Sequence, residues 1–284
     1  MIRSVKDEIW AFDCEWAPDP QAGRLLYGLP ADMPDLDVMN VMWQRNGATP
    51  EDPTPFLKTI LCRIVSIAAV RRRARGNEIK LDLLWLPRDP ADLAQQQEPA
   101  IISTFLQAIG KHQPQLVGFN SRNSDLRILM QRAVTLGLSA PEFCHRPEKP
   151  WEGVDYFHRD NEWHIDLMDL LCGWSSRGYV ALHEVATLSG IPGKFAADGE
   201  QVPNMWIAGR LREIVQYNCF DALTTYLVWL RIAHLAGLFD DERYEDEQQL
   251  VRELIMQLAE QPENEFLSRY FDEWERLQAL TGQS

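Results

Sequence analysis

The sequence predicts an α/β protein in which a mixed sheet, built from an antiparallel β-meander and parallel strands, is flanked by helices. Three early segments rich in β-branched and aromatic residues predict the meander, at 8–16, 59–70 and 79–87. Helices and strands then alternate, which is typical of parallel strands joined by helical connections. Apolar residues at helical spacing predict helices at 99–112, 125–138, 181–190 and 211–237, and short apolar runs predict strands at 115–120 and 164–171.

We expect one large domain with an appendage. Residues 1–239 form the main domain in this interpretation, with a long irregular insertion at 17–58 that is rich in Pro, Asp and Met. Residues 240–284 carry 13 acidic and 4 basic side chains, a balance of −9, whereas residues 1–239 have a balance of −5. Their helical periodicity predicts an acidic C-terminal extension packed on the same domain with a solvated face, and a partner-binding tail is the alternative.

The composition excludes some classes of protein. A net charge of −14 is the opposite of what a protein needs to coat DNA or RNA by neutralising phosphates. The five cysteines are widely spread and form no CxxC pair, so we expect reduced thiols in a cytoplasmic protein. The chain shows no secretory signal core and no apolar run of about 18 residues, so we expect no association with a membrane.

A pair of carboxylates in the first predicted strand is a candidate metal site. Asp13 and Glu15 are two residues apart, so both side chains point to the same face of the sheet. Two carboxylates on an otherwise apolar strand repel each other and are costly to desolvate unless a cation joins them. A strand end exposed to water is the alternative explanation.

Two later motifs add polar groups in suitable elements. In VGFNSRNSD, Asp125 opens a helix and Asn120 precedes it; a third metal carboxylate is the functional interpretation, and helix capping is the structural one. In YNCFD, Tyr217 and Asp221 lie one turn apart on one face of the long helix, where a hydrogen bond between helical neighbours also explains them. The three motifs together, in this order, favour a single site.

In this combination the sequence resembles the DEDD superfamily of 3′–5′ exonucleases, in its tyrosine-bearing subclass (DEDDy). FDCEW resembles the first motif, GFNSRNSDLRIL the second and YNCFDALTTYL the third. A histidine five residues before the last Asp would mark the other subclass, and Gln216 stands there. The resemblance is closest to stand-alone bacterial exonucleases related to the proofreading domain of family B DNA polymerases, and it extends to ILCRIVSIAAV, HIDLMDLL and LHEVATLSGIPGKFAADGEQV.

The resemblance implies an RNase H-like sheet and a two-metal phosphodiesterase. Asp13 would bridge two divalent ions, Glu15 and Asp221 would complete the ion that activates water, and Asp125 would bind the ion on the leaving-group side. Hard oxygen ligands favour Mg²⁺ or Mn²⁺. Tyr217 would orient the attacking water together with Glu15. The product would be a nucleoside 5′-monophosphate released from a free 3′ end.

Contacts to the substrate are predicted from the same motifs. Asn120 and Arg122 are candidates for binding the terminal sugar or phosphate. The aromatic residue that often precedes the Asp of the second motif is replaced here by Ser124. A ring that stacks on the terminal nucleotide is then either missing or supplied from elsewhere, by Trp16 or Phe119.

Two further groups of charged residues have alternative explanations. Asp166 and Asp169 in HIDLMDLL are rival carboxylates, which a strand-to-helix junction also explains. A dense run of arginines after the second predicted strand is expected in a solvated turn or along the substrate backbone: Arg71, Arg72, Arg73 and Arg75.

The sequence therefore predicts a metal-dependent 3′–5′ exonuclease acting on single-stranded DNA, in repair or end trimming. An exoribonuclease of RNase D type shares the motifs and is the first alternative. The second is a non-catalytic module that binds nucleic acid or protein through a nuclease-like fold. The complete set of four carboxylates with Tyr217 argues against that module.

Overall fold

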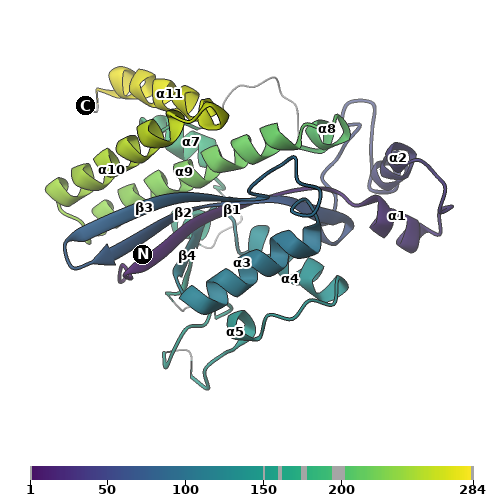
Figure 1. Ribbon diagram of the computed structural model, residues 1–284, viewed down its shortest axis with the longest axis horizontal. Helices are drawn as coiled ribbons and strands as arrows, with labels where there is room; N and C mark the ends of the chain where they lie inside the picture. The colour runs from purple at the N-terminus through teal and green to yellow at the C-terminus, as the bar shows by residue number, and fades with distance from the viewer. Residues whose placement is uncertain (1, 150, 159–161, 174–177, 194–201, 283–284) are drawn as a thin grey trace.

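The computed structural model describes residues 2–149, 151–158, 162–173, 178–193 and 202–282. Residues 194–201, which belong to the last segment of the resemblance, lie outside the described residues. At the centre is a five-stranded sheet with the order β3-β2-β1-β4-β5 (Figure 1). The strands are β1 (Glu8–Pro18), β2 (Cys62–Arg75), β3 (Glu78–Leu86), β4 (Gln115–Gly118) and β5 (His164–Asp166).

The pairing of these strands confirms the predicted mixed sheet. β1, β2 and β3 form an antiparallel meander, whereas β4 pairs parallel to β1 and β5 pairs parallel to β4. β4 accompanies β1 only along Ile9–Ala11. Beyond that point the two parallel strands separate, and among the described residues no strand pairs with the carboxyl-terminal half of β1 on that side, which we call its free edge. Ligands of α/β sheets bind at such points, where the chain leaves neighbouring strands in opposite directions.

Helices cover both faces of the sheet, because the side chains of β1 alternate between two apolar layers. Ile9 and Ala11 belong to one layer, and Trp10 and Phe12 belong to the other. The first layer is closed by α7 (Leu182–Leu188), α9 (Leu211–Leu235), α10 (Asp241–Ala259) and α11 (Phe266–Thr281) (Figure 1). The second is closed by α3 (Glu98–His112), α4 (Asp125–Thr135) and α5 (Pro141–Cys144).

The prediction that residues 17–58 are irregular is wrong. β1 runs to Pro18, and the segment then forms α1 (Pro20–Tyr27) and α2 (Asp35–Arg45), with the short 3₁₀ helix η1 (Thr59–Leu61) after it. Asp19 caps α1 by accepting the N–H of Gln21 at 3.0 Å, and Pro20 opens the helix. Asp and Pro, which indicated a loop, are helix-start residues here. The helices persist because α2 buries Met42 and Trp43 against the second apolar layer.

The strand predicted at 164–171 is also mostly wrong. Only His164–Asp166 pair with β4, and the chain continues as α6 (Leu167–Cys172). The side chain of Asp166 accepts the backbone N–H groups of Met168 and Asp169, at 3.1 and 3.4 Å, and thereby starts the helix. The strand-to-helix junction considered for these carboxylates is therefore present. The remaining helices are α8 (Val202–Ile207) and the 3₁₀ helix η2 (Pro262–Asn264).

The run of arginines lies in β2 and not in a turn, and three of its four side chains are paired with carboxylates of the fold, whereas Arg75 is exposed. Arg71 and Arg73 both bind Asp82 of β3, at 2.9 Å. Arg72 is buried and binds both carboxylate oxygens of Glu247, at 2.6 and 2.7 Å. Glu247 belongs to α10 and also accepts the hydroxyl of Tyr226 at 2.8 Å. A buried, bidentate ion pair thus joins α10 to the centre of the sheet.

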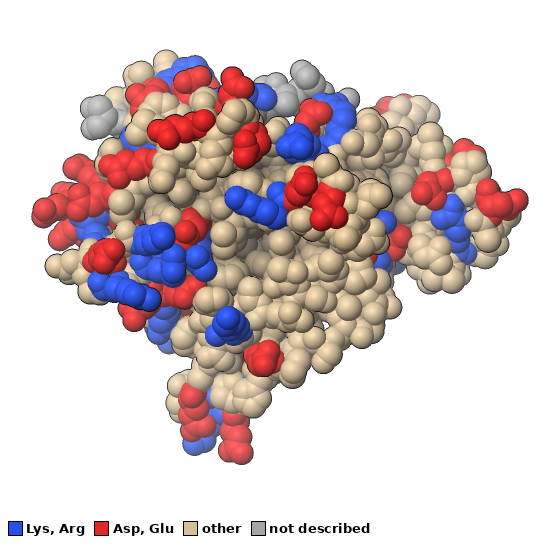
Figure 2. Space-filling view, in the orientation of Figure 1, with Lys and Arg blue, Asp and Glu red and all other residues tan. Residues whose placement is uncertain are grey.

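Residues 240–282 pack their apolar face on α9 and expose their acidic face. Tyr270 and Trp274 of α11 are fully buried, and the hydroxyl of Tyr270 lies 3.0 Å from Thr224 Oγ1 in α9. Figure 2 shows a group of acidic side chains at the end of the molecule where α10 begins. This group consists of exposed residues of the first turns of the helix and its cap, namely Asp240, Asp241, Glu242, Glu245 and Asp246.

Two further observations concern the cysteines and the helices. All five cysteines are free, and three of them are buried. Within the part of the chain that the structure describes, none of the helices is long and apolar enough to cross a membrane.

We expect Glu247→Ala to lower the free energy of unfolding by about 3–5 kcal/mol, because it leaves Arg72 buried without a carboxylate. Glu245→Ala, two residues away on the exposed side of α10, is the matched control and should change it by less than about 0.5 kcal/mol. Urea denaturation followed by tryptophan fluorescence measures both. Equal effects of the two substitutions would contradict the anchoring role of Glu247.

Candidate active site

The predicted pair on β1 faces α9. Asp13 and Glu15 continue the face of Ile9 and Ala11, whereas Cys14 points into the opposite apolar layer. α9 packs over that face and carries the third motif. The alternation of the strand and the position of the helix therefore bring residues more than 200 positions apart in the sequence to one place.

Three carboxylates meet at this crossing of β1 and α9. Asp13, Glu15 and Asp221 are half-buried, and each offers an oxygen within 4.8 Å of the others. The hydroxyl of Tyr217 is hydrogen-bonded to Asp221 one helical turn away. Asn218, which is fully buried, donates from Nδ2 to Asp13 Oδ2 at 3.4 Å. Asn218 was not predicted from the sequence. The sequence indicates it only as a polar amide among the apolar residues of a helix.

Asp125 lies beside this group, at the free edge of β1. It opens α4, is 2% exposed, and accepts the backbone N–H of Cys14 on Oδ1 at 2.9 Å. Ser124 Oγ donates to its other oxygen at 2.8 Å. Asp125 is not part of the 4.8 Å group, but its charge acts on Asp13 more strongly than that of either other carboxylate. Ser124, where an aromatic residue was expected, thus orients the carboxylate.

Burial and mutual repulsion perturb the acids of the site. The pKa of Asp13 is raised well above its usual value by burial, and then by the charges of Asp125, Glu15 and Asp221. Burial raises the pKa of Asp125 to about 6, against the hydrogen bonds from Ser124 and Cys14 that lower it. Burial and the neighbouring carboxylates also raise the pKa of Tyr217. Such a group of buried, repelling acids is stabilised by a multivalent cation.

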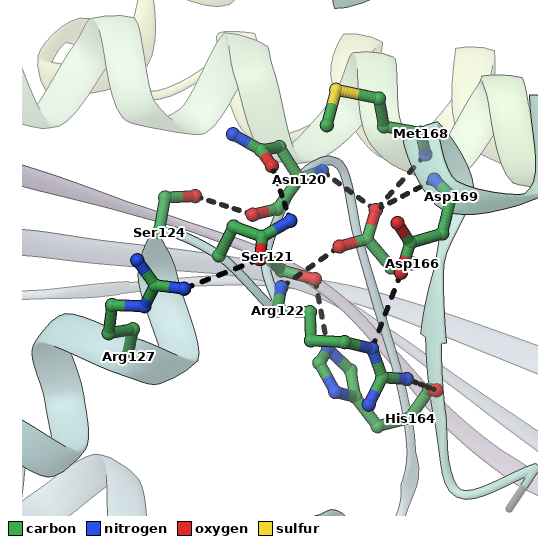
Figure 3. Close-up of polar contacts among 10 residues, drawn as sticks. Asn120, Ser121, Arg122, Ser124, Arg127, His164, Asp166, Met168 and Asp169 are labelled. Atoms are coloured by element: carbon green, nitrogen blue, oxygen red, sulfur yellow. Dashed lines mark hydrogen bonds and ion pairs between the residues drawn. The ribbon is translucent and has the colours of Figure 1, made fainter. Parts of the chain in front are cut away.

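The predicted substrate residues Asn120 and Arg122 lie in the loop between β4 and α4 (Figure 3). Asn120 has a positive φ of 56°, in the left-handed region that Asn tolerates. The guanidinium of Arg122 donates to the carbonyl of His164 at 3.2 Å and lies 3.4 Å from a carboxylate oxygen of Asp169. The side chain of Arg122 is therefore held inside the protein.

Trp16 lies on the α4 side of β1, where an exposed ring contacts it. The side chain packs against the second apolar layer, and its ring meets that of Phe56 edge to face with centroids 6.3 Å apart. Phe56 is 80% exposed. Phe119, the alternative ring, packs against the first apolar layer. The pair of Trp16 and Phe56 brings together rings 40 positions apart in the sequence, which no local pattern predicts.

Fold and site together define a nuclease-like protein with a carboxylate cluster. Residues 54–274 match a family described as predicted 3′–5′ exonucleases related to the exonuclease domain of PolB, and the chain belongs to this family. The matched range includes Asp125, Tyr217 and Asp221 and extends into α11, whereas β1 with Asp13 and Glu15 precedes it. The cluster thus joins residues from inside and outside that range.

The chain also has similarity to solved structures. No curated protein matches the chain. Among solved structures, the chain is similar to the family B DNA polymerase of the hyperthermophilic archaeon Pyrobaculum calidifontis, with 15% sequence identity and a TM-score of 0.44. The similarity covers 79% of this chain and 25% of the polymerase, so the chain spans about a quarter of that protein.

Exonucleases of this kind normally use divalent metal ions, and the donor set fits them. The group consists of carboxylate oxygens, the hard ligands that Mg²⁺ and Mn²⁺ prefer. The raised pKa of Asp13 shows the electrostatic cost that a bound cation would remove. The arrangement can therefore hold divalent ions beside a tyrosine hydroxyl.

We expect Asp13→Asn to stabilise the metal-free protein, because it removes a buried charge that three carboxylates repel. In EDTA at neutral pH the midpoint of thermal unfolding should rise by about 2–6 °C, which corresponds to about 1–2 kcal/mol. Mn²⁺ should raise the midpoint of the wild type but not that of Asp13→Asn.

The exposed Asp246→Asn is the control for this measurement and should retain the wild-type midpoint and its response to Mn²⁺. A lower midpoint for Asp13→Asn in EDTA would contradict the proposed repulsion.

Proposed function

We propose that the protein is a metal-dependent 3′–5′ exonuclease that releases nucleoside 5′-monophosphates from free 3′ ends of single-stranded DNA. The observation that carries the proposal is the meeting of Asp13, Glu15 and Asp221 within 4.8 Å in a chain of an exonuclease family. Tyr217 beside Asp221 supports the tyrosine-bearing subclass. In this proposal residues 1–239 are the catalytic domain, and 240–284 are an extension packed on it.

The four carboxylates would divide the binding of two divalent ions among them. Asp13 is repelled by Asp125 as well as by Glu15 and Asp221, and in this proposal it would bridge the two ions. When bound, the ions would supply a water of lowered pKa and charge stabilisation for the transferred phosphoryl group. This assignment explains why the protein maintains a group of acids that repel one another.

Tyr217 acts as a positioning group for water and not as a base. Its raised pKa keeps the hydroxyl protonated at neutral pH, so it cannot take a proton from water. Its hydrogen is donated to Asp221, and its oxygen would accept one hydrogen of the attacking water while Glu15 would accept the other. The two side chains come from different elements, and together they define one direction of attack.

The terminal nucleotide is held at the free edge of β1. Asn120 provides an amide for the sugar or phosphate, and the rings of Trp16 and Phe56 provide a surface on which a base can stack. Arg122, the other predicted contact, would have to release the carbonyl of His164 to reach a phosphate. Stacking without hydrogen bonds to base edges accepts any base, which suits an enzyme that degrades a strand of mixed sequence.

We expect Asp221→Asn to lower the rate of cleavage by more than about 100-fold. Substitution of a residue that only supports a metal ligand already lowers activity by up to that factor. Digestion of 5′-labelled DNA and RNA oligomers with free or blocked 3′ ends, in Mg²⁺ or Mn²⁺, measures activity, polarity and substrate class together. Glu213→Gln removes an exposed carboxylate two turns earlier on α9 and should retain full activity.

Each other outcome of that digestion selects a different function. A preference for RNA would replace the DNA assignment by an exoribonuclease. Unchanged cleavage by Asp221→Asn would place the active site elsewhere. Absence of cleavage and of a thermal shift by Mn²⁺ would support a non-catalytic binding module.

We expect Phe56→Ala to raise KM for single-stranded DNA by about 5- to 100-fold with kcat unchanged, because one stacked base contributes about 1–3 kcal/mol. Steady-state kinetics on an oligomer measures both constants. Trp151→Ala removes a comparably exposed ring from the loop after α5 and serves as the control. Equal KM values for the two variants would exclude Phe56 from the substrate path.

A further inference from the structure

Asp166 has no role in the function proposed so far, yet its side chain is one of the most heavily hydrogen-bonded in the structure. It is 3% exposed and ends β5, directly opposite Gly118 at the end of β4. Its Oδ1 accepts the backbone N–H of Asn120 and its Oδ2 that of Arg122, both at 2.9 Å (Figure 3). The N–H groups of Met168 and Asp169 at the start of α6 complete the set.

These four donors favour a structural role for Asp166 over metal binding. Three of them lie at Oδ1 and one at Oδ2, so most of the about four lone-pair positions of the carboxylate are directed at backbone N–H groups. Asp166 is also absent from the group of carboxylates that lie within 4.8 Å of one another among the described residues. It binds the protein backbone, and the backbone that it binds leads to the active site.

The loop held by Asp166 is short and strained, and Asp125 follows it immediately. Asn120 keeps a left-handed conformation, and its carbonyl accepts the N–H of Ser124 at 3.0 Å. The hydroxyl of Ser124 lies 2.7 Å from the same carbonyl and 2.8 Å from Asp125 Oδ2, and its one hydrogen is donated to either acceptor. A chain of bonds therefore runs from Asp166 through Asn120 and Ser124 to Asp125.

Neighbouring contacts hold the same loop from the side of β5. Ser121 Oγ lies 2.9 Å from His164 Nε2, and Arg122 binds the carbonyl of His164. Gly118 permits this close approach, because a Cβ there would overlap the side chain of Ser121. The contacts with His164 involve side chains, whereas those with Asp166 fix the backbone itself.

We propose that Asp166 is a positioning residue that places Asp125 for metal binding by holding the backbone of residues 120–124. The inference rests on the proposed function, because Asp125 has a role in it only if the carboxylates bind divalent ions. Residues that orient metal ligands typically contribute 10- to 100-fold to metal affinity. Asp166 would contribute to metal affinity indirectly, through the loop of residues 120–124 that precedes Asp125.

Two substitutions separate this role from the capping of α6. Asp166→Asn presents an amide N–H to one of the backbone donors and so breaks at least one bond to the loop. Asp166→Ser retains an acceptor for the N-cap of α6, but its hydroxyl is too short to reach residues 120 and 122 as well. Both substitutions should weaken the positioning of Asp125, but they differ in the N-cap that they leave for α6.

Asp155→Asn is the matched control. Asp155 is another aspartate that is 1% exposed, and it accepts the N–H groups of Phe157 and His158, at 2.9 and 3.0 Å, in the loop before β5. Its replacement also removes a charged acceptor from a loop, but that loop does not lead to Asp125. A purely structural effect should therefore be similar in the two aspartate-to-asparagine variants.

The experiment measures Mn²⁺ binding by isothermal titration calorimetry and, separately, the Mn²⁺ concentration that gives half-maximal cleavage of a 5′-labelled oligomer. We expect both Asp166 variants to weaken Mn²⁺ binding by about 10-fold or more and to regain cleavage at high Mn²⁺, whereas Asp155→Asn behaves as the wild type. KM for the oligomer at saturating Mn²⁺ should change much less than the metal requirement.

The outcomes distinguish this inference from the proposed function. Wild-type Mn²⁺ affinity in both Asp166 variants, with or without a lower midpoint of unfolding, would overturn the positioning role. A wild type that binds Mn²⁺ but cleaves no nucleic acid would overturn the proposed function, and the calorimetric comparison would still test Asp166. A wild type that binds no Mn²⁺ would overturn both.

Discussion

Carboxylates that repel one another face each other where α9 packs on β1, and the rest of the fold holds them there. Burial and three neighbouring charges raise the pKa of Asp13, so the metal-free site opposes folding. The apolar layer beneath α9 provides the opposing contribution, with fully buried side chains such as Trp229 and Tyr226 packed against the sheet. Packing therefore preorganises the carboxylates in the metal-free protein.

Regular elements and a buried ion pair hold the site in place. Asp13 and Glu15 lie on the central strand, Asp221 lies within a helix of 25 residues, and Asp125 lies at the first residue of another helix. The ion pair of Arg72 and Glu247 joins α10 to the same sheet and closes the layer from outside. The acidic residues of 240–284 thus lie mostly on the outer faces of α10 and α11, whose inner faces belong to the core.

Local patterns in the sequence were sufficient for part of the site and misleading for other segments. The period of two placed Asp13 and Glu15 on one face, and the helical period placed Tyr217 near Asp221. The same reasoning failed for residues 17–58, because Asp and Pro start helices as readily as they form loops. It also failed for Arg72, since nothing local indicates that one arginine in a run meets a glutamate 175 positions later.

The sequence by itself determined the chemistry of the site, namely which acids, in which elements, and with which residues on the same face. It also determined the mixed sheet, because strand and helix periods are local properties of the chain. Tertiary structure alone decided that β4 leaves β1 after Ala11 and that Asp125 accepts the N–H of Cys14 at the free edge of β1. It also decided that Asp166 holds the loop between β4 and α4. These contacts join residues 46 to 111 positions apart, and they depend on how the layers pack, which no local period encodes.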